Sequence, residues 1–490
     1  LVHHLALNIL FVHFLIIVKN TYLDSFDKLF YNLEKISPLN DAKLLSANQS
    51  AANLIDLNLE NISNDDMKKL LNGEILLNNS KPYSMAYAGH QFGSRVPQLG
   101  DGRAMNIGTI NGWHLQLKGS GQTKYSRQGD GRAVLRSSIR EYLMSEAMHG
   151  LGIPTTRALA INTSKHGVPR EWKTEKGAVV LRLSQSWIRI GSFEFFYYNG
   201  GKESVQKLAN YVIEENYPYL KDSETKYKDF YFELVDKSAK MVSLWQSVGF
   251  MHGVLNTDNT SVIGVTLDYG PFAFMDKFEK HNICNHTDSQ GRYSYANQPS
   301  IIQWNLKVLA VTLQGIVAKE ELDEINEMFM FLYTKYYYEQ MSKKLGLVDG
   351  SNTNSHKLLD GLLDILEECE IDYTNFFYIL SIYTSKDEVL ELTLKKDILN
   401  TWFDKYNNIC QEQDISKEER QEQMSKINPK YVLKNYMIQE AIDKANDDDF
   451  SLVEDLLKVA QNPYKNYEAM NKYVKNTPSE LSNLRLSCSS

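Results

Sequence analysis

The residues best suited to chemistry lie in HGVLNTDN at 252–259 and in a DYG tripeptide that begins at Asp268. Asp258, Asn259 and Asp268 offer carboxylate and amide oxygens, and Mg²⁺ takes one or two such ligands beside phosphates and water. A carboxylate can also accept a proton. We therefore expect Asn259 and Asp268 to hold a divalent metal and Asp258 to act as a base. The alternative is a polar loop with an Asn/Asp turn.

The spacing of these two motifs is that of a protein-kinase catalytic loop and its metal-binding tripeptide. In kinase loops the third position carries the Asp that accepts the proton of the substrate hydroxyl. This chain has Val254 at that position. Asp258 is the carboxylate that remains, at a place that suits a different phosphate geometry.

Glycine-rich stretches supply candidate phosphate contacts. QLGDGRA carries Gly100, Gly102 and Arg103, and glycines let backbone N–H groups approach phosphates closely. A simple hairpin turn is the alternative. Lys118 ends a β-like run, where a kinase places its phosphate-binding Lys. The helix predicted after it offers Glu141 and Glu146 as partners, and helical spacing does not decide between them.

A second glycine-rich loop, GSGQTKYSRQGDGRA, follows Lys118 directly. Asp130 and Gly131 come just before the predicted helix, whose N-terminus favours an anion. Asp130 could instead be the helix N-cap. Arg182 and Arg189 lie in and just after a strand-like run, and guanidinium groups bind phosphates bidentately. Structural ion pairing is the alternative for both arginines.

The elements that position these residues fall into two parts. Short β-like runs at 104–110, 113–119 and 178–184 surround a helix over 133–152 that closes on Gly150. From about 203 helical patterns dominate (301–345, 357–410 and 430–460), broken by a loop-rich region at 252–300. Residues 20–80 read as short helices and loops, with helical turns at 25–33. We predict an α+β fold with a small β-rich N-terminal lobe and a large helical C-terminal lobe, as in protein kinases. The expected divisions are an apolar segment at 1–20, an N-terminal extension and N-lobe at 21–200, and a C-lobe with a C-terminal extension at 201–490.

Composition narrows the class of partner. The 490 residues include 53 Lys and Arg against 61 Asp and Glu, a net charge of −8, which argues against a nucleic-acid-binding protein. Four cysteines are too few for a disulfide scaffold and favour a reducing compartment. The apolar run at 5–18 lacks a basic start and a cleavage site and is short for a membrane span, so a buried segment or a misassigned start is favoured over targeting. We expect no membrane association.

Several long motifs resemble the selenoprotein O family, also called the YdiU family. They are YAGHQFG, QLGDGRA, LKGSGQTKYSRQGDGRAVLRSSIREYLMSEAMHGLGIPTTRALA, GFMHGVLNTDNTSVIGVTLDYGPFAFMD, ICNHTDSQGRYSYANQPSIIQWNL and NPKYVLKNY. The resemblance runs from about residue 20 to the C-terminus. Members of this family are pseudokinase-fold protein adenylyltransferases, in which ATP is bound in a flipped orientation. AMP, rather than phosphate, is then transferred to a Ser, Thr or Tyr hydroxyl of a protein, and pyrophosphate leaves.

The resemblance implies roles for individual residues. Asp258 would be the proton acceptor, Lys118 would pair with Glu141, and Asn259 and Asp268 would hold Mg²⁺ or Mn²⁺. The implied ATP contacts are Gly100, Gly102, Arg103, Lys118, Asp130, Gly131, Arg182, Arg189 and Asp268. A phosphotransferase and a non-catalytic nucleotide-binding scaffold are the alternatives. The location expected is the cytoplasm, or mitochondria in a eukaryote.

The family resemblance also suggests redox chemistry. Cys284 matches a family position and Cys488 lies third from the end, where members can carry Cys or selenocysteine. A reversible Cys284–Cys488 disulfide is the resulting hypothesis, and two free thiols are the alternative. Lys434 in NPKYVLKNY stands where the family leads us to expect Arg, which keeps the charge but not the forked geometry.

Overall fold

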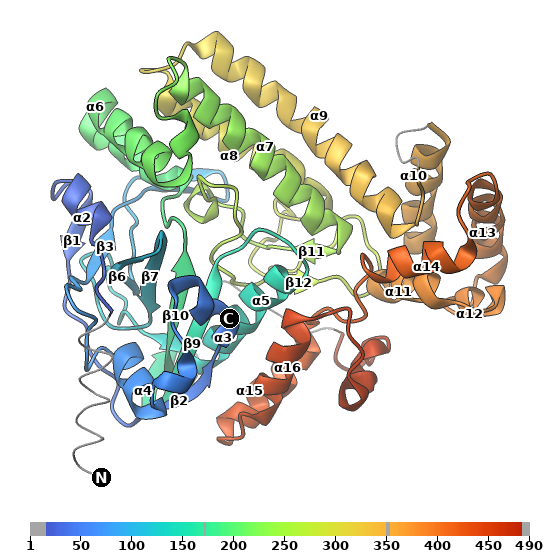
Figure 1. The fold of residues 1–490 in the computed structure, drawn as a ribbon, viewed down its shortest axis with the longest axis horizontal. Helices are drawn as coiled ribbons and strands as arrows, with labels where there is room; N and C mark the ends of the chain where they lie inside the picture. The colour runs from blue at the N-terminus through green and yellow to red at the C-terminus, as the bar shows by residue number, and fades with distance from the viewer. Residues whose placement is uncertain (1–15, 171–172, 349–352, 483–490) are drawn as a thin grey trace.

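The computed structural model describes residues 16–170, 173–348 and 353–482, and it is an α+β structure. A β-rich region occupies the N-terminal part of the chain, and helices dominate after it (Figure 1). The apolar run predicted at 5–18 lies mostly outside the described residues. Within the described part, no helix is long and apolar enough to cross a membrane.

The main sheet is antiparallel and has the strand order β1-β3-β6-β7-β10-β9-β2, with β8 paired to β10. Its strands are β1 Tyr31–Leu33, β2 Ala42–Ala47, β3 Tyr83–Met85, β6 Ala104–Ile110, β7 Trp113–Lys118, β8 Ala133–Val134, β9 Arg157–Arg170 and β10 Lys173–Ser184. Two small two-stranded sheets, the β4 Gly89–Gln91 and β5 Ser94–Val96 hairpin and the pair β11 Phe250–Met251 with β12 Ala273–Phe274, stand apart from it.

Alternation along the strands separates an apolar face from a polar one. Leu115, Leu117 and Leu181 pack with α4 (Asn64–Asn72) and α3 (Gln49–Ala52) in one core. Side chains of successive strand residues point to opposite faces. Gln116, Lys118 and Arg182 therefore face the other side of the sheet, toward α5 (Leu135–Gly150).

Helix α5 is covered on both sides. It packs on β9 and β10, and its outer side contacts α15 (Asn435–Asn446) and α16 (Ser451–Gln461). Ile139 and Leu143 are fully buried in this core. The remaining helices near the sheet are α2 Thr21–Ser25 and the 3₁₀ turns η1 Asn53–Ile55 and η2 Leu59–Asn61.

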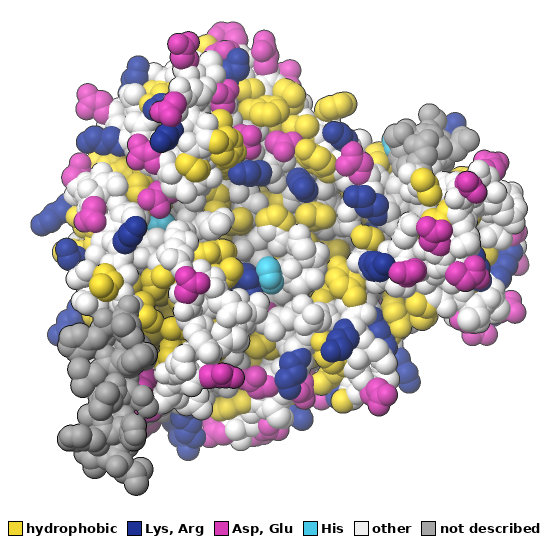
Figure 2. All heavy atoms as spheres, in the orientation of Figure 1, with side chains coloured by type: hydrophobic (Ala, Val, Ile, Leu, Met, Phe, Trp, Pro, Cys, Tyr) yellow, Lys and Arg dark blue, Asp and Glu magenta, His cyan; other side chains and the backbone are white. Residues whose placement is uncertain are grey.

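The helical region has two groups (Figure 1). α6 (Ile190–Asn216), η3 (Pro218–Leu220), α7 (Lys226–Ser247), η5 (Tyr295–Asn297), α8 (Gln298–Leu313) and α9 (Lys319–Lys344) form the first. The second holds α10 (Thr353–Glu368), α11 (Tyr373–Ile382), α12 (Lys386–Leu390), α13 (Lys396–Gln411) and α14 (Lys417–Ser425). η6 (Glu468–Val474) follows α16, and η4 (Thr257–Asn259) lies in the loop between β11 and β12. Figure 2 shows basic and acidic side chains mixed over the face in view.

The sequence-based expectations mostly match these elements, with four corrections. β6, β7 and the second half of β10 match the predicted runs, and α5 matches the predicted helix. The helical turns predicted at 25–33 are wrong, because α2 ends at Ser25 and Phe26 and Phe30 turn into an aromatic cluster before β1. Helix begins at Ile190, earlier than the predicted start near 203, and non-helical backbone at Gly201 (φ +64°) divides α6 close to that start. Residues 20–80, predicted as short helices and loops, also contain strands β1 and β2. The 14-residue strand β9 was not predicted.

Candidate active site

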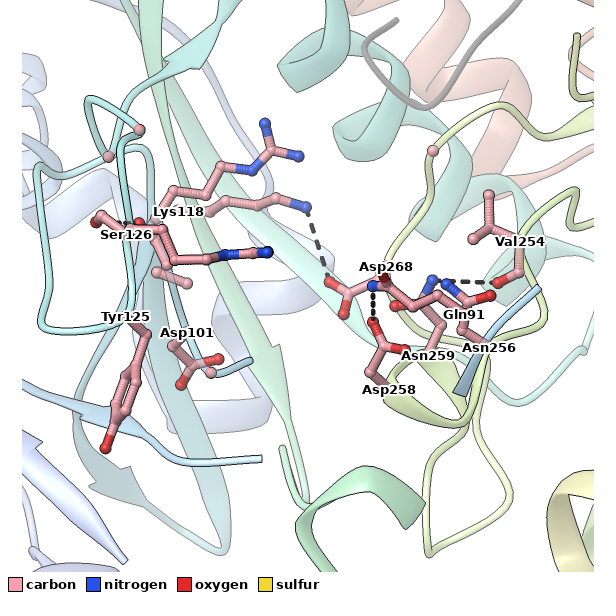
Figure 3. Close-up of a pocket in the computed structure, with 18 of the residues that line it drawn as sticks. Gln91, Asp101, Lys118, Tyr125, Ser126, Val254, Asn256, Asp258, Asn259 and Asp268 are labelled. Carbon is pink, nitrogen blue, oxygen red and sulfur yellow. Dashed lines mark hydrogen bonds and ion pairs between the residues drawn. The ribbon is translucent and has the colours of Figure 1, made fainter. Parts of the chain in front are cut away.

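A cleft of about 1030 Å³ gathers most of the predicted site residues (Figure 3). One wall consists of the glycine-rich loops at 100–103 and 125–132, and the other of η4 and the segment 268–271. Seven lining residues are basic and four are acidic. They are Arg103, Lys118, Arg127, Arg132, Arg170, Arg182 and Arg189, against Asp101, Asp130, Asp258 and Asp268. An excess of cations in a chain with a net charge of −8 suits an anionic ligand.

Asp268 is the centre of the charge cluster. Its Oδ1 accepts a hydrogen bond from Arg182 Nη1 (2.8 Å) and its Oδ2 accepts one from Arg189 Nη1 (2.6 Å). Lys118 Nζ lies 3.7 Å from Oδ1. Although burial opposes ionisation, Arg189, Arg182 and Lys118 hold the pKa of Asp268 well below its usual range. Asp268 also has φ +60°, a conformation that non-glycine residues rarely adopt and that clusters at functional sites.

Lys118 pairs with Glu141, not with Glu146. Lys118 Nζ lies 2.6 Å from Glu141 Oε2, and Arg182 Nη1 donates to Glu141 Oε1 (2.5 Å). Burial lowers the pKa of Lys118 below its ordinary value. Burial would raise the pKa of Glu141, but Arg182 and Lys118 outweigh it and the pKa lies below the usual value. Glu146 instead forms a buried two-bond pair with Arg157.

The neighbours of the two arginines fix their orientation. Arg182 donates to Gln116, which lies directly opposite it on β7, and its guanidinium lies over the Trp187 ring. Arg189 is the N-cap residue of α6, lies over the Tyr87 ring and donates to the Asp258 carbonyl (2.7 Å). Both arginines therefore form structural ion pairs and also line the cleft. A structural role and a phosphate-binding role, the two alternatives predicted for them, do not exclude each other.

Asp258 has a different environment from Asp268. Its Oδ2 accepts a hydrogen bond from Gln91 Nε2 (3.1 Å), while its buried Oδ1 has no hydrogen-bond partner among the described residues. Gly89 makes room for this carboxyl, because a Cβ there would lie 2.3 Å from Oδ1. Burial raises the pKa of Asp258 to about 6, and Gln91 and Arg189 offset this only in part. Asp258 can therefore change its protonation state near neutral pH.

The oxygens of Asn259 and Asp268 fit a hard divalent cation. Asn259 Nδ2 donates to the Val254 carbonyl (3.1 Å), which leaves Oδ1 for a ligand. Each Asp268 oxygen has one close guanidinium nitrogen and keeps a second lone pair. An all-oxygen set suits Mg²⁺ or Mn²⁺ and not zinc. Within residues 16–170, 173–348 and 353–482, no group of three or more His, Cys, Asp or Glu could hold a metal.

The two glycine-rich loops pack on each other. Gly100 and Gly102 of the first loop lie against Tyr125 of the second, and within the second loop a Cβ on Gly131 would lie 2.1 Å from the Gly121 carbonyl oxygen. The hairpin-turn interpretation of Gly100–Gly102 is wrong, because the loop joins two strands that do not pair: β5 pairs with β4, and β6 pairs with β3 and β7. Asp130 is not an N-cap, because α5 begins five residues later; it pairs with Arg170 (2.8 Å). Arg103 is exposed in the cleft wall.

Sequence reasoning missed several cleft residues. Asp101, between Gly100 and Gly102, is buried, and burial raises its pKa to about 6. Tyr125 and Arg127 line the cleft from the second glycine-rich loop, and Gln91 lines it beside Asp258. The glycine-rich context of Asp101 and Arg127 was a usable signal. Gln91 lies in the YAGHQFG motif at 87–93, but no local pattern shows its contact, which depends on a residue 167 positions away.

The structure describes only one of the two cysteines in the disulfide hypothesis. Cys284 is free, its thiol donates to the Pro271 carbonyl (2.9 Å), and burial raises its pKa to about 12. Cys488 lies outside the described residues, so the pairing stays a prediction. Lys434 is buried between Asp372, which accepts a hydrogen bond from it, and Asp276 (3.3 Å).

Comparison with known proteins identifies the family. The model of the family described as "Protein adenylyltransferase SelO" matches residues 14–461. The chain belongs to this family. Three relatives are each named "Protein nucleotidyltransferase YdiU". The one from Myxococcus xanthus is 42% identical over 93% of this chain and 95% of its own length. Those from Pseudomonas fluorescens Pf-5 and Aliivibrio fischeri are 40% and 41% identical, over 92% and 94% of this chain and 94% and 96% of their own lengths.

Proposed function

We propose that this protein transfers AMP from ATP to Ser, Thr or Tyr hydroxyls of other proteins and releases pyrophosphate. The observation that carries the proposal is the placement of carboxylates in the cleft. Val254 occupies the position of the kinase base, whereas Asp258 lies beside the Asp268 cluster, with Asn259 next to it. The printed names of the family and of its relatives point to the same class of reaction.

The basic residues of the cleft define how the triphosphate is held. Arg182 and Arg189, with the glycine-rich loop that ends at Gly131, bind the outer phosphates, and Lys118 is fixed for this task by Glu141. Holding the outer phosphates deep in the cleft presents the α-phosphorus to the incoming hydroxyl. This corresponds to a flipped nucleotide in a kinase-like two-lobed fold.

Asp258 accepts the proton of the attacking hydroxyl. The oxygen of that hydroxyl then bonds to the α-phosphorus, the bond from the α-phosphorus to the bridging oxygen breaks, and pyrophosphate leaves. Bound Mg²⁺ or Mn²⁺, on Asn259 and Asp268, would neutralise phosphate charge. Apart from the proton transfer, the protein contributes positioning and electrostatic stabilisation.

The test uses ATP labelled at the α or the γ phosphate, with Mg²⁺, a reductant and a cell extract. We expect protein to be labelled from the α position alone, and Asp268→Ala to lose the label. Label from the γ position alone would show a kinase that uses another base. ATP binding without label from either position would favour a nucleotide-binding scaffold.

A further inference from the structure

The β4–β5 hairpin borders the cleft at Asp258. Gln91 donates to Asp258, the His90 backbone N–H donates to Thr257 Oγ1 (2.7 Å), and the Phe92 N–H donates to the Tyr293 hydroxyl (2.8 Å). Figure 3 shows Gln91 beside Asp258, across the cleft from Lys118 and Tyr125. The glycine-rich wall is assigned to the nucleotide, so the acceptor hydroxyl must approach Asp258 from the hairpin side.

A continuous set of aromatic and cationic side chains covers this hairpin. Arg95 lies over the Tyr198 ring (3.7 Å to its centroid), and on the neighbouring strand the His90 ring lies 5.3 Å from Trp304. Arg292 lies over Trp304 (4.9 Å) and 3.4 Å from the position of a Cβ on Gly93. We call this set the hairpin surface: His90, Phe92, Arg95, Tyr198, Arg292 and Trp304.

The two arginines of the hairpin surface form no ion pair with a described residue. Neither Arg95 nor Arg292 has a carboxylate oxygen within 4.0 Å in the part of the chain that the structure describes. Two other arginines do pair, Arg136 with Glu175 and Arg170 with Asp130, whereas Arg103 and Arg127 in the cleft wall form no ion pair with a described residue. The buried Glu194, whose Oε2 lies 2.7 Å from His90 Nδ1, supplies part of the counter-charge for Arg95 from beneath the hairpin. In a protein with a net charge of −8, two guanidinium groups without an ion pair beside an active-site cleft still mark a place for a negatively charged partner.

Phe92 joins the hairpin surface to the cleft. It has φ +51°, its side chain is 39% exposed, and its ring lies 5.1 Å from that of Tyr293. It lines the cleft next to Gln91. An exposed aromatic ring held in a fixed place can pack against the side chain of a bound segment at little cost in conformational entropy.

We propose that the hairpin surface binds the acceptor polypeptide and selects segments that carry carboxylates beside the modified hydroxyl. Arg95 and Arg292 pair with those carboxylates, and Phe92 packs against the residue that enters the cleft. The role of this surface in choosing acceptors rests on the proposed AMP transfer. Peptide binding, however, can be measured without any AMP transfer and tests the surface independently.

Binding is measured first, by fluorescence anisotropy with the full chain. The probe is a labelled peptide with a central Tyr flanked by two Asp on each side, compared with the same peptide carrying Asn at those positions. We expect the acidic peptide to bind about tenfold more tightly at low salt, and this advantage to shrink as salt screens it. Equal affinity of the two peptides would overturn the proposal, whatever the enzyme does with ATP.

Variants locate the effect. Arg95→Gln combined with Arg292→Gln should abolish the preference for the acidic peptide and leave the affinity for ATP unchanged. Lys405→Gln with Lys475→Gln makes the same change in net charge on α13 and after η6, and it should keep the preference. Arg95→Glu should turn the preference toward a peptide with Lys at the four positions. Loss of the preference in the lysine control would overturn the proposal, since a general field would then explain the binding.

A kinetic measurement distinguishes failure of the acceptor surface from failure of the proposed AMP transfer. With α-labelled ATP, the arginine variants should raise KM for the acidic peptide about tenfold and leave kcat and KM for ATP near the wild-type values. Label on extract proteins without any advantage for acidic peptides would refute the acceptor surface alone. Competition by single-stranded RNA as strong as that by the acidic peptide would show a general polyanion surface and would also refute it.

Discussion

Two loops bring a carboxylate into the same cleft, and their surroundings divide the roles. The segment at 268–271 places Asp268 among Arg182, Arg189 and Lys118, which hold its pKa well below the usual range. The η4 loop places Asp258 against Gly89 with one amide donor, and burial raises its pKa to about 6. Because these environments shift the two pKa values in opposite directions, Asp268 stays charged while Asp258 can take up and release a proton.

The largest effect should come from removing the permanent charge. Asp268→Ala leaves three buried cations without their shared carboxylate, so we expect AMP transfer to fall by about a thousandfold or more and the free energy of unfolding to fall by about 3–5 kcal/mol. Transfer assays and chemical denaturation measure the two effects. Asp268→Asn removes the same charge but preserves the side-chain volume, so it separates the loss of charge from the cavity that Ala leaves. Activity within tenfold of wild type would contradict the role given to Asp268.

Asp258→Asn should affect activity alone. Loss of a proton acceptor lowers kcat by about a hundredfold to a thousandfold, while removal of a buried carboxyl with one hydrogen bond should not lower the melting temperature. Steady-state kinetics and thermal denaturation at pH 8 check this. If Asp258→Asn lost as much stability as Asp268→Ala, Asp258 would also be a structural charge, and the contrast between the two carboxylates would be wrong.

Glu141 and Glu146 sharpen the comparison on one helix. Glu141→Gln weakens the pairing with Lys118 and Arg182 and should raise KM for ATP or lower kcat, with about a hundredfold loss in kcat/KM. Glu146→Gln breaks the buried pair with Arg157 and should lower stability by about 3 kcal/mol. For the folded Glu146→Gln protein, kcat/KM within a few-fold of wild type is expected. The opposite pattern would reverse the assignment of the lysine partner.

The smallest effect concerns Asp101, a buried carboxyl whose pKa is raised from 3.8 to about 6. A raised carboxyl pKa means that the folded state binds the proton more tightly, so the ionised group destabilises the fold above pH 6, and this penalty shrinks as the pH falls and is gone below the ordinary pKa of 3.8. Asp101→Asn should therefore be more stable than wild type at pH 8 by about 1–3 kcal/mol, with the difference lost near about pH 3. The free energy of unfolding of both proteins, measured at the two pH values, tests this. A stability difference that does not change with pH would contradict the raised pKa of Asp101.

The sequence predicted the parts of the site that are local, and not those that need strand register. Lys118 and Arg182 both end or lie in runs with clear β character, but their common face follows from the pairing of β7 with β10. Glu141 could not be chosen over Glu146 until α5 was placed, since Arg157 on β9 takes Glu146. β9 was missed because Gly167 and Pro169 near its end indicate a turn.

The position of α16 has a consequence for how the protein is made. It packs on α5, Gln461 donates to Asn48 (2.7 Å), and a Cβ on Gly150 would lie 1.9 Å from the Ala460 carbonyl oxygen. The helix that carries Glu141 therefore receives its outer cover from a helix far along the chain. On the ribosome the sheet emerges first, and α5 stays without this cover until α16 has been synthesised, so the β-rich region cannot complete its packing before about residue 461.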